Sequence, residues 1–306
     1  MRYNYHVESV IHVKNLVKSF GKTPVVKDLS FDVNKGDVFA FLGANGSGKT
    51  TTIRCLLDIL QPTRGSALIF GNKFDLALAS RIGYLPEERG LYTNAQVMET
   101  LVYFAQLKGM TTADAKQKAL KYLDRVELSA HHATEIKKLS SGQQQKIQLG
   151  ITLINAPDLL ILDEPTKGLD PVNRSLLMEL LDELNENGAT IVFVSHQMDE
   201  VEKIANRLVM IKNGSQALYG SLQEVKKQFG TNTIHITYQG EIPSNDAMYR
   251  SSSIENNVAE LTPTSETSTN DVISHLIQHN VIINDFTIGT PSLQDVFVKV
   301  MKSEQY

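Results

Sequence analysis

A glycine-rich run ends in a lysine and two threonines, residue types that bind phosphate groups and magnesium. It reads GANGSGKTT from Gly43 to Thr51. Glycines let backbone N–H groups approach phosphate oxygens closely, and the N-terminus of a following helix attracts anions. The Lys49 amine would bridge the β- and γ-phosphates of a nucleotide, and the Thr50 hydroxyl would bind Mg²⁺. The nucleotide-binding residues predicted from this run are Gly43, Ala44, Asn45, Gly46, Ser47, Gly48, Lys49, Thr50 and Thr51.

The segments on either side of this run fit a phosphate-binding loop. Residues 37–42 (DVFAFL) are apolar after the first, as expected of a buried strand, and residues 51–57 (TTIRCLL) are typical of a helix opening. A flexible loop is the alternative interpretation of a glycine-rich run. The strand before it and the helix after it favour the phosphate site.

Two acids directly follow a second apolar run. Residues 159–162 read LLIL, and Asp163 and Glu164 come next. Strands that are buried on both faces of a parallel sheet are continuous apolar runs, and ligands bind beyond their carboxyl ends. We therefore expect Asp163 near the metal and Glu164 near the γ-phosphate, where it would orient and deprotonate the attacking water. The alternative, a solvated strand end, explains one acid more readily than two.

A histidine follows a third apolar run. Residues 190–195 (TIVFVS) read as a strand, and His196 comes directly after it. One predicted helix, 173–187, separates this strand from the acid-bearing strand, so the two strands are expected to be neighbours in the sheet. His196 would then reach the γ-phosphate or hold the water.

A further segment reads LSSGQ from Leu139 to Gln143. Together with the phosphate loop, the acids and His196, it resembles the nucleotide-binding subunits of ATP-binding cassette (ABC) transporters over residues 11 to about 230, and it disfavours a small-molecule kinase. The resemblance implies an ATPase that uses ATP and Mg²⁺. It also implies that Phe20 stacks on the adenine and that Asp170 lies in the aspartate-containing loop of the family.

The resemblance further implies a site that two cassettes share. Two cassettes, identical or paralogous, would pack head to tail, so that the LSSGQ segment of one meets the γ-phosphate held by Lys49 of the other. A short serine and a glycine before a helix make a second anion-binding terminus, which has no obvious purpose within one subunit. An ordinary helix cap is the alternative, and it is compatible with this role. The residues implied at this surface are Ser140, Ser141, Gly142 and Gln143.

Two residues depart from the commonest cassette pattern. Most members carry glutamine where this chain has Glu87, and Ser141 replaces the second glycine of the LSGGQ form. Glu87 still offers Mg²⁺ an oxygen ligand but adds a negative charge. The metal ligands expected are therefore Thr50, Asp163 and Glu87. The wording LPEERGLY at 85–92 resembles the branch that contains bacterial sodium-efflux ATPases and related drug or peptide exporters, whose membrane partner is a separate polypeptide.

In transporters, the helical subdomain and the loop of Glu87 form a groove that receives a short helix of the membrane partner. Leu91, Tyr92, Val97 and Tyr103 are candidates for this groove. The alternative is that these residues belong to the core, because apolar residues at helical spacing usually pack inward.

The expected fold is α/β, with a mixed central sheet, an antiparallel β subdomain and a helical subdomain. The ATPase domain is expected over residues 1–230, with its helical subdomain at about 88–150. The composition shifts near 230, and residues 231–306 are typical of a small α+β accessory domain. In this domain the patterns predict strands at 231–238 and 281–288, helices at 270–279 and 291–301, and a loop-rich stretch at 244–257.

The composition fits an ATPase that acts with a membrane partner. No apolar run approaches the roughly 20 residues that span a bilayer, and residues 1–10 lack the apolar core of a signal peptide. The single cysteine, Cys55, suits the cytoplasm, and a formal charge of −4 gives no general attraction to nucleic acid. We expect a separate polytopic membrane subunit to hold this chain at the cytoplasmic face of the membrane, with no nucleic acid bound.

A soluble cassette ATPase acting on a ribosome or a nucleic-acid complex is the alternative function. Ribosomal members usually carry two cassettes in one chain, and DNA-repair members separate their halves by a long coiled coil. This chain has one phosphate loop and no coiled-coil repeat. The sequence therefore favours the transporter.

Overall fold

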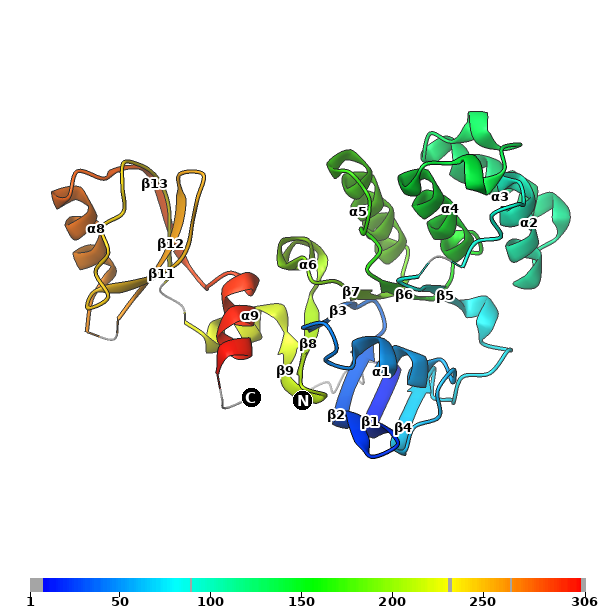
Figure 1. Cartoon of the computed structure of the whole chain (residues 1–306), viewed down its shortest axis with the longest axis horizontal. Coiled ribbons are helices and arrows are strands. Elements are labelled where there is room, and N and C mark those ends of the chain that lie inside the picture. Colours follow the sequence, from blue (N-terminus) through cyan, green and yellow to red (C-terminus); the bar gives the residue numbers. More distant parts are fainter. Residues whose placement is uncertain (1–7, 89, 231–232, 265, 304–306) are drawn as a thin grey trace, which may run out of the picture. The chain divides into compact units, whose positions relative to one another are not determined.

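The computed structural model describes residues 8–88, 90–230, 233–264 and 266–303, without the side chains of 252–255. The chain divides into two compact units, Met1–Tyr219 and Gly220–Tyr306 (Figure 1). The second unit thus begins ahead of residue 230, where the composition shifts, and it includes helix α7 (Leu222–Gln228).

The central sheet of the first unit has six strands, in the order β5 (Ile82–Leu85), β6 (Leu159–Asp163), β7 (Thr190–Val194), β3 (Val38–Gly43), β8 (Arg207–Lys212) and β9 (Ser215–Ser221). The neighbours from β5 to β8 pair in parallel. Every residue of β3, β6 and β7 is buried, which explains their unbroken apolar runs. Asn213 and Gly214, both with positive φ, join β8 to β9 in the short connection that is typical of a hairpin. The expected mixed sheet is confirmed.

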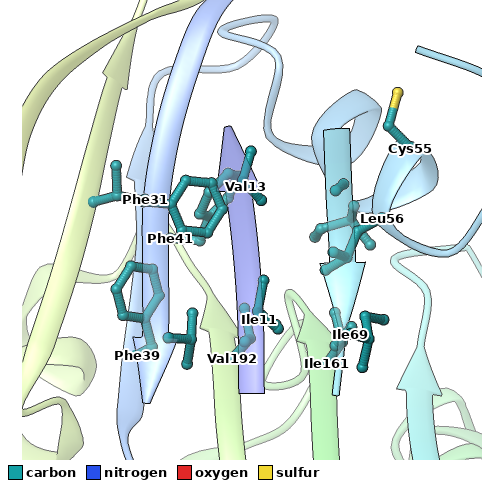
Figure 2. Packing of buried hydrophobic residues seen from close by; sticks show 14 of the residues in the cluster. Ile11, Val13, Phe31, Phe39, Phe41, Cys55, Leu56, Ile69, Ile161 and Val192 are labelled. Carbon is teal, nitrogen blue, oxygen red and sulfur yellow. The ribbon is translucent and has the colours of Figure 1, made fainter. Parts of the chain in front are cut away.

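A three-stranded antiparallel sheet lies beside the central sheet and consists of β2 (Thr23–Asn34), β1 (Ser9–Phe20) and β4 (Arg64–Ile69). The two sheets share one apolar core, part of which is shown in Figure 2. Phe31 of β2 stacks on Phe39 of β3 with ring centroids 5.6 Å apart. This core holds β3, and therefore the start of the glycine-rich loop, in place.

The helices of the first unit follow the expected pattern. The segment between 93 and 153 is mainly helical, and three of its helices enclose a core of their own that includes Leu101, Leu123 and Ile147. The helices are α1 (Lys49–Leu56), α2 (Val97–Leu107), α3 (Thr112–Arg125), α4 (Ser141–Leu153), α5 (Pro171–Glu186) and α6 (Met198–Ile204), with short 3₁₀ turns η1 (Ala79–Arg81), η2 (Ser129–His131) and η3 (Ile136–Lys138).

The second unit is an antiparallel sheet with helices. Its strand order is β11 (Tyr249–Glu255), β12 (Val258–Pro263), β10 (Thr233–Gln239) and β13 (Ile282–Gly289). Besides α7, it has helices α8 (Thr269–Gln278) and α9 (Leu293–Lys302). These elements confirm the expected α+β composition, although residues 231–232 of the first expected strand lie outside the described residues.

One expectation for this unit is wrong. The polar stretch at 244–257 was expected to be loop-rich, but it contains strand β11, which pairs antiparallel with β12. Asn256 and Asn257 both have positive φ, which is the backbone of a tight hairpin turn. Pairing with β12 stabilises an edge strand whose own side chains are too polar to show a strand pattern.

Candidate active site

The glycine-rich loop connects the buried end of β3 to the start of α1. Gly48 precedes the helix with a φ of 106°, and a Cβ atom there would lie 2.9 Å from the carbonyl oxygen of Val25. A Cβ atom at Gly43 would lie 2.5 Å from both the Ile211 carbonyl oxygen and the Ser47 hydroxyl oxygen. Close packing therefore requires glycine at both positions, and the loop closes tightly over the helix N-terminus.

Lys49 is the first residue of α1, and its amine points back into the loop. Its Nζ donates to the carbonyl oxygens of Gly43, at 2.8 Å, and Ala44, at 3.2 Å. Burial lowers the pKa of Lys49, while the charges of Glu164 and Asp163 act in the opposite direction. The buried Ser47 hydroxyl has no hydrogen-bond partner among the described residues. An ammonium group and an unused hydroxyl beside a glycine loop fit phosphate oxygens.

Asp163 ends β6 and lies against the start of α1. The Thr50 hydroxyl donates to Asp163 Oδ2 at 3.1 Å. Burial raises the pKa of Asp163, and this hydrogen bond partly opposes the rise. No three His, Cys, Asp or Glu side chains cluster into a metal site in the part of the chain that the structure describes. Mg²⁺ needs only one or two carboxylates when phosphate oxygens and water complete its shell, so this pair fits a metal that arrives with a nucleotide.

Glu164 and His196 follow the neighbouring strands β6 and β7. The Glu164 backbone N–H donates to the carbonyl oxygen of Val194 at 2.9 Å, and its φ is 53°. A left-handed conformation is uncommon for glutamate and marks a site where the surrounding structure constrains the backbone. The Glu164 carboxylate lies 2.9 Å from His196 Nδ1. The carboxylate is buried, whereas the imidazole is largely exposed. The neighbouring strands thus bring these two groups together, as the sequence predicted.

Glu87 makes an ion pair that the sequence did not reveal. It lies just after β5, and the amine of Lys167 is 2.7 Å from its Oε1 atom. Lys167 lowers the pKa of Glu87, mainly through this hydrogen bond and further through its charge. The extra negative charge of Glu87 is a reason to expect a basic side chain near it. Nothing in the sequence indicates which basic residue that is.

These groups line one cavity of about 340 Å³ at the carboxyl edge of the sheet. The predicted residues that line it are Asn45, Gly46, Gly48, Lys49, Thr50, Thr51, Glu87, Asp163, Glu164 and His196. The predicted loop residues Gly43, Ala44 and Ser47 are not among its lining residues. Val25 and Lys167 also line it, and no motif in the sequence marks either residue.

The LSSGQ residues do not line this cavity. Ser140 caps helix α4: its hydroxyl accepts from the Gln143 backbone N–H at 3.2 Å, and the Gln143 side chain accepts from the Ser140 N–H at 2.9 Å. Ser141 is the first residue of the helix, and Gly142 follows it. The expected helix cap is therefore present, at a surface separate from the cavity.

Two more predicted residues lie outside the cavity. Phe20 ends β1 and is half-exposed, and the Lys18 amine lies 5.1 Å from the centroid of its ring. Asp170 caps α5 by accepting from the Asn173 backbone N–H at 2.9 Å. This hydrogen bond lowers the pKa of Asp170.

Glutamines of α4 brace the loops of the site, a feature that no sequence motif indicates. Gln145 donates to the carbonyl oxygen of Pro165 at 3.1 Å, and Gln148 donates to those of Pro86 and Glu88 at 3.5 and 3.4 Å. One helix therefore contacts both the loop that follows Glu164 and the loop that contains Glu87.

Comparisons with known proteins agree with this arrangement. The ABC transporter family profile matches residues 26–167, and the profile of the C-terminal domain of DrrA1-3-like ATP-binding proteins matches residues 220–301. The chain is 35% identical to the ABC transporter ATP-binding protein YhaQ of Bacillus subtilis, over 95% of this chain and 98% of YhaQ. It is 33% identical to the linearmycin resistance ATP-binding protein LnrL of Bacillus subtilis, over 74% of this chain and 73% of LnrL.

A solved ATP-binding subunit of an ABC transporter has the same fold. It matches with a TM-score of 0.69 and 28% identity, over 72% of this chain and 93% of that one. No helix in the described part of the chain is long and apolar enough to cross a membrane. From the cavity geometry, the cassette fold and these relatives together, we conclude that the chain belongs to the family of ABC transporter ATP-binding subunits, whose cassette domain binds and hydrolyses ATP.

Proposed function

We propose that this chain hydrolyses Mg²⁺-bound ATP in the cavity beside β3 and couples that reaction to export through a separate membrane subunit. The observation that carries the proposal is the convergence of Lys49, Asp163, Glu164 and His196 on one cavity at the sheet edge. These side chains come from three separate parts of the sequence. Their types match the needs of phosphoryl transfer, which depends mainly on positioning and charge stabilisation.

The glycine-rich loop and Lys49 hold the phosphates in this proposal. On nucleotide binding, the Lys49 amine exchanges its two loop carbonyls for phosphate oxygens, and the Ser47 hydroxyl gains a partner. Thr50, Asp163 and Glu87 would hold Mg²⁺, which would neutralise charge on the phosphate oxygens. The ring of Phe20, half-exposed and beside the Lys18 amine, stacks on the adenine in this proposal.

Glu164 is the general base, and His196 positions it. The Glu164 carboxylate is buried at the cavity wall, where it can accept a proton from water. The His196 imidazole, 2.9 Å away, restricts the rotation of the carboxylate and lines the same cavity. Holding one carboxylate orientation favours in-line attack.

The second half of the site comes from another cassette. The N-terminus of α4 lies outside the cavity of its own chain, so its anion-binding potential has no use there. A Cβ atom at Gly142 would meet only the Gly168 carbonyl oxygen, at 3.7 Å, which is an ordinary contact. Packing within the chain therefore does not require glycine at 142. A glycine at this position would allow close approach of a phosphate held by a second cassette, and Ser140, Ser141 and Gln143 lie at the same helix end.

An exposed aromatic surface supports the proposal of a membrane partner. Tyr92, Tyr103 and Leu107 are exposed in the helical region, and the rings of Tyr92, Tyr103 and Phe104 pack together with centroids 5.4–6.3 Å apart. Val97, another groove candidate, is fully buried and belongs to the core. Clustered aromatic side chains at a surface are typical of protein interfaces. Likeness to a protein named for Nod factor export and to one named for resistance to linearmycin supports export.

The substitution Glu164→Gln tests the central assignment. We expect this variant to bind ATP normally, because the phosphate contacts remain, and to lose turnover by about 100-fold or more, the scale of one removed general base. Binding of a fluorescent ATP analogue and steady-state phosphate release measure the two effects. Hydrolysis near the native rate would refute the role of Glu164. Recovery of a polytopic membrane protein with the tagged chain from solubilised membranes tests the partner, and recovery of ribosomes or DNA instead would contradict it.

A further inference from the structure

The Glu87–Lys167 ion pair joins two loops of the site. Strands β5 and β6 are parallel neighbours, so the loops after them leave the same edge of the sheet. Glu87 lies in the first loop and Lys167 in the second, and both side chains line the cavity. The Lys167 backbone N–H donates to the Glu164 carbonyl oxygen at 3.1 Å. The pair therefore ties the loop of Glu87 to the turn that carries the proposed general base.

Lys167 also contributes to the balance of charges that line the cavity. Among the described residues, three carboxylates line the cavity, from Glu87, Asp163 and Glu164, together with the amines of Lys49 and Lys167 and the imidazole of His196. A triphosphate brings more negative charge to the same space. Without Lys167, the Glu87 carboxylate would lose the amine that offsets its charge next to the phosphates.

We propose that Lys167 is a positioning residue of the Mg²⁺–ATP site. Its amine holds the Glu87 carboxylate at the cavity and cancels the charge of that carboxylate. The ion pair thus takes the place of a neutral side chain at position 87. This inference rests on the proposed function of the cavity. Lys167 acts through Glu87 and does not need to contact the nucleotide. Its importance therefore depends on which residue occupies position 87.

A double-mutant cycle in the Glu164→Gln parent tests this dependence without hydrolysis. The Kd of a fluorescent N-methylanthraniloyl-ATP with saturating Mg²⁺ is measured for Lys167→Gln, Glu87→Gln and the double variant. Both side chains are partly exposed, 60% for Lys167 and 44% for Glu87, so the effect is moderate. We expect Lys167→Gln to raise the Kd about two- to fivefold with Glu87 present. In the Glu87→Gln background, the same lysine substitution should leave the Kd unchanged.

Two further variants control for general effects. Arg81 pairs with Asp158 at 2.6 Å and has similar exposure, but this pair precedes the same two strands and so lies at the opposite edge of the sheet. Arg81→Gln should leave the Kd unchanged. Lys167→Arg keeps the positive charge at this position, so it should bind with the same Kd as the Glu164→Gln parent. That result would show that the effect of Lys167→Gln comes from the lost charge and not from a loss of folding.

The outcomes separate the inference from the function on which it rests. If the Glu164→Gln parent does not bind Mg²⁺–ATP, the proposed function is wrong and the inference falls with it. If the parent binds, two results would show that only the positioning role is wrong. Lys167→Gln could raise the Kd equally with Glu87 present and in the Glu87→Gln background, or it could leave the Kd unchanged in both. An effect confined to the protein that retains Glu87 supports it.

Discussion

Replacement of Ser140 by alanine separates the structural role of this residue from its proposed catalytic one. In the structure, Ser140 caps α4 through a 3.2 Å hydrogen bond from the Gln143 N–H. Removing a serine cap costs about 1 kcal/mol. A domain that is stable by about 5–15 kcal/mol stays almost fully folded after that loss, so the cap alone cannot lower activity appreciably.

The proposed contact with a phosphate across two cassettes predicts a far larger effect. A hydrogen bond to a charged group is worth about 1.5–3 kcal/mol, which corresponds to about a 10- to 100-fold lower rate of ATP hydrolysis. Ser268→Ala is the control, because Ser268 is also exposed and caps α8 by accepting from the Asp271 N–H at 3.2 Å, while its hydroxyl further donates to Asp271 Oδ2 at 2.6 Å. Ser140→Ala should lower the unfolding temperature by no more than Ser268→Ala does, because Ser268 makes one hydrogen bond more.

The assay is steady-state phosphate release at saturating Mg²⁺–ATP, measured over a range of protein concentrations. Thermal unfolding of the same samples gives the cost of each lost cap. If Ser140→Ala hydrolyses ATP as fast as Ser268→Ala, then Ser140 is only a helix cap, and the case for a site shared by two cassettes fails.

Three other predictions follow from particular contacts. Gly48→Ala should abolish binding of the fluorescent ATP analogue, because the added methyl group would lie 2.9 Å from a backbone oxygen of Val25 at a φ of 106°; normal binding would show that the loop can relax. Burial lowers the pKa of Lys108 to about 8, so the folded protein binds fewer protons than the unfolded chain between pH 8 and its ordinary value of 10.5. The free energy of unfolding, relative to Lys108→Met, should therefore rise with pH across that window in urea titrations, and a flat difference would contradict this. In the second unit, His235 Nδ1 lies 3.3 Å from Glu260, and this hydrogen bond raises the pKa of His235. Glu260→Gln should lower that pKa in an NMR titration, and an unchanged midpoint would exclude the pair as its cause.

Local patterns predicted much of this fold. The strands β3, β6 and β7 could be predicted from their apolar runs, because a strand buried on both faces needs apolar side chains at every position. The glycine-rich loop could be predicted because only glycine tolerates its close packing. The cap of α4 could be predicted because serine and Gln143 satisfy the free N–H groups of a helix end. Each of these signals depends on residues that are near one another in the chain.

Tertiary structure decided the features that depend on distant segments. Strand β11 exists because β12 offers its backbone a partner, and its polar sequence carries no strand pattern. Lys167 meets Glu87, and Gln148 of α4 braces the loop of Glu87, only because the order of strands in the sheet places these loops at one edge. The amino-acid sequence by itself determined which residue types could bind and cleave a nucleotide, since that chemistry resides in short motifs. The packing of the sheet decided which charges face one another in the cavity, because contacts between distant segments depend on the whole folded chain.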